Sequence, residues 1–103
     1  MADFVEVAAL DQIKPGSSLV VRVGRESVAL FNLGGQIYAI NDSCPHAGSS
    51  LSAGKIDGKV VTCLAHGLKF DLTTGYAGGE PGFGVASYPV QIIDEKILVS
   101  VPA

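Results

Sequence analysis

The cysteines and histidines of this chain of 103 residues occur as two closely spaced pairs. Cys44 and His46 form the first pair, and Cys63 and His66 form the second, with sixteen residues between the pairs. Thiolates and imidazoles are the side chains that bind soft and borderline transition metals. Two cysteines could also form a disulfide, but each cysteine here precedes a histidine by two or three residues, which favours a metal centre.

The distribution of ligand types between the pairs narrows the choice of metal. Common zinc modules place two cysteines in one loop and two histidines in the other, whereas each pair here supplies one of each type. Such a mixture suits a centre with two chemically different irons, one bound by the thiolates and the other by neutral imidazoles. A tetrahedral zinc site in a small interaction module is the alternative, and it would be colourless and silent in EPR.

The residues around these pairs extend the pattern over most of the chain and resemble those of a Rieske ferredoxin. The closest resemblance is to the small ferredoxins of bacterial aromatic-ring-hydroxylating dioxygenase systems, which serve aromatic hydrocarbon catabolism. It implies one [2Fe–2S] cluster, with the inner iron held by cysteines and the outer iron by histidines near the surface. The matching segments are Cys44–Gly48, Leu51–Gly54, Cys63–Gly67, Phe70–Asp71 and Thr74–Gly75.

The same resemblance assigns supporting roles to residues near the four expected ligands, which are Cys44, His46, Cys63 and His66. Pro45, Gly48 and Gly67 would let the ligand loops turn tightly and bring backbone N–H groups close to the cluster sulfurs. The segment from Gly78 to Gly84 lies where the family has a proline-containing loop over the cluster. His46, His66, Pro45 and the loop of Pro81 would then form the docking surface.

The loops also indicate where the redox potential lies within the Rieske range of about −150 to +300 mV. High-potential relatives carry an additional disulfide between their ligand loops, but Ser49 and Ala65 occupy the matching positions. Those relatives place hydroxyl residues after the second histidine, where this chain has Leu68 and Phe70. Fewer hydrogen-bond donors stabilise the reduced cluster less, so we expect a midpoint potential below zero.

Short apolar runs separated by turn signals indicate an all-β protein. Thirteen glycines support this, and the best helical stretch, Ala8 to Lys14, is at most two turns long. Together with the resemblance, this predicts a Rieske-type fold of small antiparallel sheets. Residues 1–103 would form one domain, with a two-loop cluster-binding subdomain over about 42–84. The expected strands lie at Phe4–Val7, Ser18–Val23, Ser27–Leu33, Gln36–Ile40, on either side of an Asp57-Gly58 hairpin turn, at Tyr88–Ile93 and at Lys96–Val101.

Composition excludes several classes of partner. The net charge of −3 and seven scattered basic residues do not provide the basic patch that nucleic acid requires. No apolar run approaches the roughly 18 residues of a membrane span. The first residues are acidic where a signal peptide would be basic, so a cytoplasmic location is expected.

The expected function is one-electron transfer without catalysis. Both histidines are committed to the cluster, so none remains for a mononuclear iron site, and no nucleotide-binding glycine motif occurs. The resemblance implies a soluble, monomeric, low-potential carrier between an NAD(P)H-dependent flavin reductase and a terminal oxygenase. The alternative is a small subunit of a larger reductase, such as nitrite reductase.

Overall fold

The computed structural model describes residues 4–42, 51, 54–63, 69–77 and 84–101. These residues form antiparallel strands and one short 3-10 turn, η1 (Leu10–Gln12). None of the helices among them is long and apolar enough to cross a membrane. The strands are β1 (Phe4–Ala9), β2 (Ser18–Val23), β3 (Glu26–Leu33), β4 (Gln36–Asn41), β5 (Lys55–Asp57), β6 (Val60–Thr62), β7 (Lys69–Asp71), β8 (Ser87–Tyr88), β9 (Val90–Ile93) and β10 (Lys96–Ser100).

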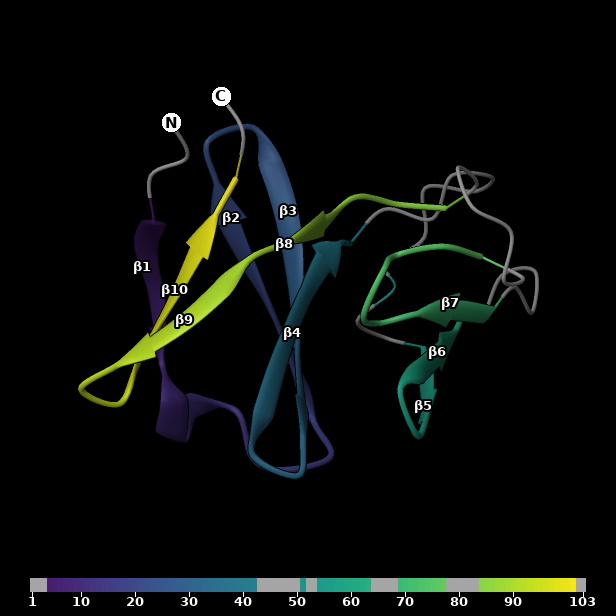
Figure 1. Ribbon diagram of the computed structural model, residues 1–103, viewed down its shortest axis with the longest axis horizontal. Helices are drawn as coiled ribbons and strands as arrows, with labels where there is room; N and C mark the ends of the chain where they lie inside the picture. Colours follow the sequence, from purple (N-terminus) through teal and green to yellow (C-terminus); the bar gives the residue numbers. More distant parts are fainter. Residues whose placement is uncertain (1–3, 43–50, 52–53, 64–68, 78–83, 102–103) are drawn as a thin grey trace.

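The strands make three sheets, with orders β1-β10-β9, β2-β3-β4-β8 and β5-β6-β7. Figure 1 shows the β2-β3-β4-β8 sheet in the middle, with the β1-β10-β9 sheet on its left and the small β5-β6-β7 sheet on its right. The all-β class and the antiparallel sheets expected from the sequence are therefore confirmed.

Strand β3 lies between two hydrophobic cores, because its consecutive apolar residues point alternately to opposite faces of the sheet. Val28 and Leu30 belong to the core shared with the β1-β10-β9 sheet. Ala29 and Phe31 belong to the core shared with the β5-β6-β7 sheet. All four side chains are fully buried, as expected for a strand that is covered on both faces.

Two-residue turns join the strands of the hairpins and set their register. Leu33 pairs with Gln36 around Gly34 and Gly35, whose φ angles are 63° and 96°. Positive φ at both central residues is the requirement of a type I′ turn, and glycine adopts it without steric cost. The predicted Asp57-Gly58 hairpin exists, but its central residues are Gly58 and Lys59, because Asp57 still pairs with Val60.

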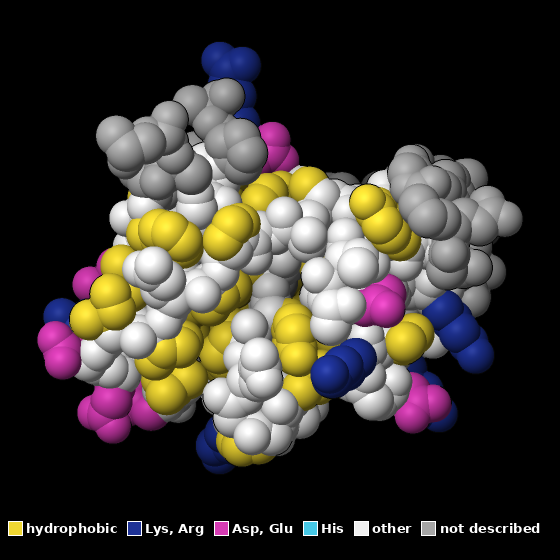
Figure 2. Space-filling view, in the orientation of Figure 1, with side chains coloured by type: hydrophobic (Ala, Val, Ile, Leu, Met, Phe, Trp, Pro, Cys, Tyr) yellow, Lys and Arg dark blue, Asp and Glu magenta, His cyan; other side chains and the backbone are white. Residues whose placement is uncertain are grey.

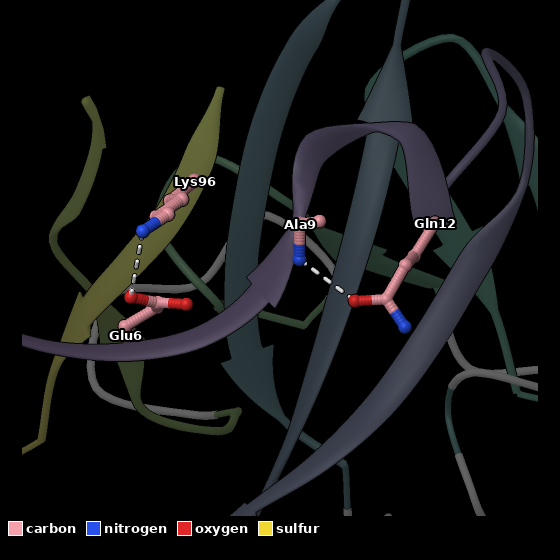
Figure 3. A network of polar contacts seen from close by, with 4 residues as sticks. All are labelled: Glu6, Ala9, Gln12 and Lys96. Carbon is pink, nitrogen blue, oxygen red and sulfur yellow. Dashed lines mark hydrogen bonds and ion pairs between the residues drawn. The ribbon is translucent and has the colours of Figure 1, made fainter. Parts of the chain in front are cut away.

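One expected element differs from the structure, and one stays within its expected limit. The best helical stretch, Ala8–Lys14, contains the single turn of η1, which is within the two turns expected, and β1 continues to Ala9. The backbone N–H of Ala9 donates to Oε1 of Gln12 at 2.7 Å, which caps this turn (Figure 3). The expected continuous strand Tyr88–Ile93 divides at Pro89, because β8 pairs with β4 whereas β9 pairs with β10. Proline has no backbone N–H to continue a ladder.

Candidate metal centre

Cys63 is the one predicted ligand among the described residues, and it is fully buried. It directly follows β6 and packs in the same core as Phe70 and Leu51. Thr62 pairs with Lys69, so the connection that carries Cys63 and His66 is closed at its base by the β6–β7 ladder. His66 itself lies in residues 64–68, outside the described part of the chain.

Cys44 and His46 lie in residues 43–50, also outside the described part, but the two ends of that segment are described. The backbone N–H of Leu51 donates to the carbonyl of Asp42 at 2.7 Å, and the N–H of Asp42 donates to the carbonyl of Ser27 at 2.9 Å. Leu51 is fully buried in the core beside Cys63. The segment therefore begins and ends at one anchored point at the end of β4.

The backbone that follows Leu51 packs directly against β6, the strand that leads to Cys63. The N–H of Gly54 donates to the carbonyl of Leu51 at 3.0 Å. A Cβ atom added to Gly54 would lie 2.3 Å from the carbonyl oxygen of Thr62 and 2.9 Å from the side chain of Val61. This contact requires glycine and brings the bases of the two ligand segments together.

A third connection, residues 78–83, also starts and ends beside this sheet. Ala77 bridges to Phe70 of β7, and Tyr76 bridges to Gly84. A Cβ atom on Gly84 would lie 2.1 Å from the carbonyl oxygen of Gly75, so the two backbones touch. Most of the segment to which the sequence assigned a covering role, including Pro81, lies outside the described residues.

The turn after β7 holds this third connection in place. One carboxylate oxygen of Asp71 accepts hydrogen bonds from the backbone N–H of Thr73 at 2.8 Å and from the Thr73 hydroxyl at 2.5 Å. The hydroxyl bond is the main reason that the pKa of Asp71 is lowered from its ordinary value, and the backbone bond adds to it. The N–H of Gly75 donates to the carbonyl of Asp71 at 2.7 Å.

The described residues fit a centre that is buried on its thiolate side. Cys63 presents sulfur from the protein interior, which suits a metal that a thiolate binds away from water. No group of three or more histidines, cysteines or acidic residues in the described ranges is arranged to hold a metal ion elsewhere. The anchoring by Leu51 and Gly75 was not predicted from the sequence; both residues belong to the segments that resemble a Rieske ferredoxin, but the resemblance gave them no structural role.

Comparisons with known proteins match the chain to a family of iron–sulfur domains and to ferredoxin components. The family model described as "Rieske [2Fe-2S] domain" matches residues 3–89. The ferredoxin component of naphthalene 1,2-dioxygenase/salicylate 5-hydroxylase systems of Ralstonia sp. is 31% identical over 98 residues, covering 94% of each chain. The biphenyl dioxygenase ferredoxin subunit of Pseudomonas sp. (strain KKS102) is 36% identical over 98 residues, covering 93% of this chain and 90% of the relative.

Two solved structures bear on the two alternatives for function. A complex of reduced oxygenase and oxidised ferredoxin in carbazole 1,9a-dioxygenase contains a chain that is 32% identical, with a TM-score of 0.83, covering 94% of this chain and 92% of that one. The small subunit of a putative NADH-dependent nitrite reductase of Mycobacterium tuberculosis has a TM-score of 0.89 over 100% of this chain and 98% of that chain. Its identity is 24%, so it supports the fold alone.

The named relatives are ferredoxin components, which confirms the expectation of an electron carrier rather than a catalytic enzyme. They also confirm the expected cofactor, one Rieske-type [2Fe–2S] cluster. With a family match from residue 3 to residue 89 and relatives of 31% and 36% identity over nearly its whole length, the chain belongs to the family of Rieske [2Fe–2S] domains.

Proposed function

We propose that Cys44, His46, Cys63 and His66 are the four ligands of the cluster, and that residues 1–103 form one domain with a cluster-binding subdomain over about 42–84. The observation that supports this most directly is the burial of Cys63 at the end of β6. The bases of the two ligand segments also meet at the contact between Gly54 and Thr62. The four residues are the only cysteines and histidines in the sequence.

The cluster supplies a site that accepts and releases one electron. The chain contributes binding and the exclusion of water from the thiolate side. Cys63 lies in a core with Phe70, Leu72 and Leu51, and all of these side chains are at most 1% exposed. Two ferric ions, two sulfides and two thiolates sum to zero, and the imidazoles are neutral, so the oxidised centre has no net charge. A centre with less negative charge is easier to reduce, so Rieske potentials lie above those of plant-type ferredoxins, near about −400 mV.

The proposed role is that of a soluble, monomeric, cytoplasmic carrier between an NAD(P)H-dependent flavin reductase and the terminal oxygenase of an aromatic-ring-hydroxylating system. The ferredoxin relatives, and the solved complex of one relative with its oxygenase, support this role. Permanent association with a nitrite reductase has weaker support, because two nitrite reductase small subunits of known structure are 24% and 26% identical to this chain, below the 32% of the ferredoxin in the oxygenase complex.

The ligand set is tested by expressing the chain, loading it with iron and sulfide, and reducing it. The wild type should be red-brown and give a rhombic EPR signal. Variants Cys44→Ser, His46→Ala, Cys63→Ser and His66→Ala should each lose that signal, whereas Ser49→Ala should retain it. Retention of the signal by any ligand variant, or a colourless zinc-loaded wild type, would contradict the proposed ligands.

The role is tested on the loaded protein. A redox titration should give a midpoint below zero, near the low end of the range from about −150 to +300 mV. In sedimentation the protein should behave as a monomer, and it should pass electrons from a flavin reductase to an oxygenase at catalytic rates. A clearly positive midpoint would contradict the low-potential assignment. Stable association with a nitrite reductase would favour the alternative, in which the chain is a small subunit of a larger reductase.

A further inference from the structure

The small β5-β6-β7 sheet has one face in the core and one face toward solvent. Cross-strand partners share a face, and Ile56, Val61 and Phe70 form a row that points into the core around Cys63. The neighbouring row, Lys55, Thr62 and Lys69, therefore points to the opposite, outer face. Both lysines are exposed, and Thr62 is half-buried between them.

This row lies at the edge of the sheet nearest to the predicted ligands, because Thr62 directly precedes Cys63. Lys55 and Lys69 stand two strands apart, or roughly 10 Å between their backbones. In the sequence, Lys55 is the first charged residue after His46 and Lys69 is the first after His66. Residues 43–50 and 64–68 contain no charged side chain of their own.

No ion pair within the described ranges neutralises these two lysines. The ion pair found there is that of Lys96 with Glu6, at 3.9 Å, on the distant β1-β10-β9 sheet (Figure 3). The acidic residues of the same outer face, Asp57 and Asp71, belong to the row two residues farther from Cys63. On this outer face the row nearest to Cys63 is thus basic, whereas the next row carries two carboxylates, with Lys59 in the turn near them.

The rest of the molecule has the opposite charge balance. The chain has ten acidic and seven basic residues. In Figure 2, most of the Asp and Glu side chains lie at the left end, around the β9–β10 hairpin, whereas the right end shows Lys and Arg side chains together with Asp and Glu side chains. An acidic partner surface would therefore be repelled by the β9–β10 end of this protein and attracted by the pair of Lys55 and Lys69.

We propose that Lys55 and Lys69 form a basic docking row that binds carboxylates on the surface of a redox partner protein and turns the cluster end toward that partner. This proposal rests on the proposed function, since it needs the cluster beside Cys63. The row contributes orientation and association rate rather than chemistry, and its effect should weaken with salt because both side chains are exposed.

A gold electrode coated with a carboxylate-terminated alkanethiol monolayer serves as a model of an acidic partner surface. At low ionic strength the loaded wild type should adsorb and give a reversible one-electron wave. The variant Lys55→Gln/Lys69→Gln should lose adsorption or slow interfacial electron transfer about tenfold, which corresponds to roughly 1.4 kcal/mol. At high salt the difference between wild type and variant should disappear.

The matched control is Lys14→Gln/Lys59→Gln, which removes the same charge from two exposed lysines elsewhere. Lys14 lies in the turn before β2, and Lys59 lies in the β5–β6 turn at the far end of the same sheet. This control should stay within about twofold of the wild type. An equal loss in the control, an unaffected Lys55/Lys69 variant, or no adsorption of the wild type would each overturn the proposal.

Failure of the proposed function is detected separately. EPR of every reduced sample reports whether the cluster is present before any electrode is used. Adsorbed mass on the same monolayer, followed by surface plasmon resonance, needs no cluster and compares the same three proteins. Equal adsorption of all three overturns the docking row even if no protein holds a cluster. A silent EPR spectrum with selective adsorption keeps the row and contradicts the function.

Discussion

The backbone N–H of Leu51 donates to the carbonyl oxygen of Asp42 at 2.7 Å, and this bond closes the base of the segment that contains Cys44 and His46. Asp42 continues from β4, and Leu51 is fully buried beside Cys63. The described C-terminal end of this segment, Leu51, therefore lies in the same core as Cys63, the proposed ligand of the second pair.

Leu51→Ala should weaken both the fold and the hold on the cluster. Removing a fully buried leucine side chain costs about 2–5 kcal/mol of unfolding free energy. The control is Leu30→Ala, equally buried but in the core on the other face of β3. Both variants should lose stability in denaturant titrations, but only Leu51→Ala should speed the loss of cluster colour to a chelator under folding conditions. Equal rates of colour loss would contradict this role.

Gly75→Ala should be far more damaging than Gly24→Ala, although both glycines have positive φ, 81° and 61°. An added Cβ at Gly24 meets nothing within 4 Å, so that variant should lose only about 1–2 kcal/mol from backbone conformation. At Gly75 the Cβ would lie 2.1 Å from the carbonyl oxygen of Val85, so the connection must shift, at a cost of roughly 3 kcal/mol or more. Thermal unfolding of the two variants side by side measures the difference; similar losses would argue against the contact.

The β9–β10 turn offers a stabilising change. Asp94 and Glu95 both have positive φ, 50° and 63°, although neither is glycine. Asp94→Asn/Glu95→Gly introduces the residues that a type I′ turn prefers, while the bond from the Leu10 N–H to the carbonyl of residue 95 uses backbone atoms and remains. We expect about 1 kcal/mol of added stability and a melting temperature higher by roughly 4–8 °C. An unchanged or lower melting temperature would show that the turn is not strained.

Thr73→Ala should raise the pKa of Asp71 toward its ordinary value, whereas Thr73→Ser, which keeps the hydroxyl donor, should leave it low. A carboxyl group with a lowered pKa in the folded state adds stability at pH values above its unfolded pKa, and this stability is lost as the pH falls through the folded pKa. The stability deficit of Thr73→Ala should therefore be present at neutral pH and shrink in acid. Carboxyl NMR titration and denaturant curves at several pH values test both statements; an unchanged pKa in Thr73→Ala would contradict them.

Local patterns in the sequence predicted the strands and hairpins well. Glycine turns such as Gly34-Gly35 and alternating apolar residues act over a few positions, and both appeared where expected. The division of the final hairpin at Pro89 was not predicted, because it depends on β8 joining β4, some fifty residues earlier. Gly54 and Gly75 were not predicted to need glycine either, because the backbone that crowds them, at Thr62 and Val85, lies on other segments that only the fold brings into contact.

The sequence indicates which residue types the candidate site contains, but not the packing and hydrogen bonds that hold them in place. Ligand type and spacing are properties of a short stretch of sequence, so the sequence suffices to propose four candidate ligands. The burial of Cys63 and the bond between Leu51 and Asp42 arise only when three sheets pack. The lysine row likewise depends on the register that aligns Lys55, Thr62 and Lys69 across three strands.

Neighbouring side chains of β3 lie in the two different cores, so both cores are built on this one strand. A ligand that binds only the folded state stabilises every part that unfolds with it. Cofactor insertion should therefore slow amide hydrogen exchange in the distant β1-β10-β9 sheet as well as around Cys63. Loss of the cofactor would expose the whole chain to proteases, and a cell could in this way clear carriers that can no longer hold an electron.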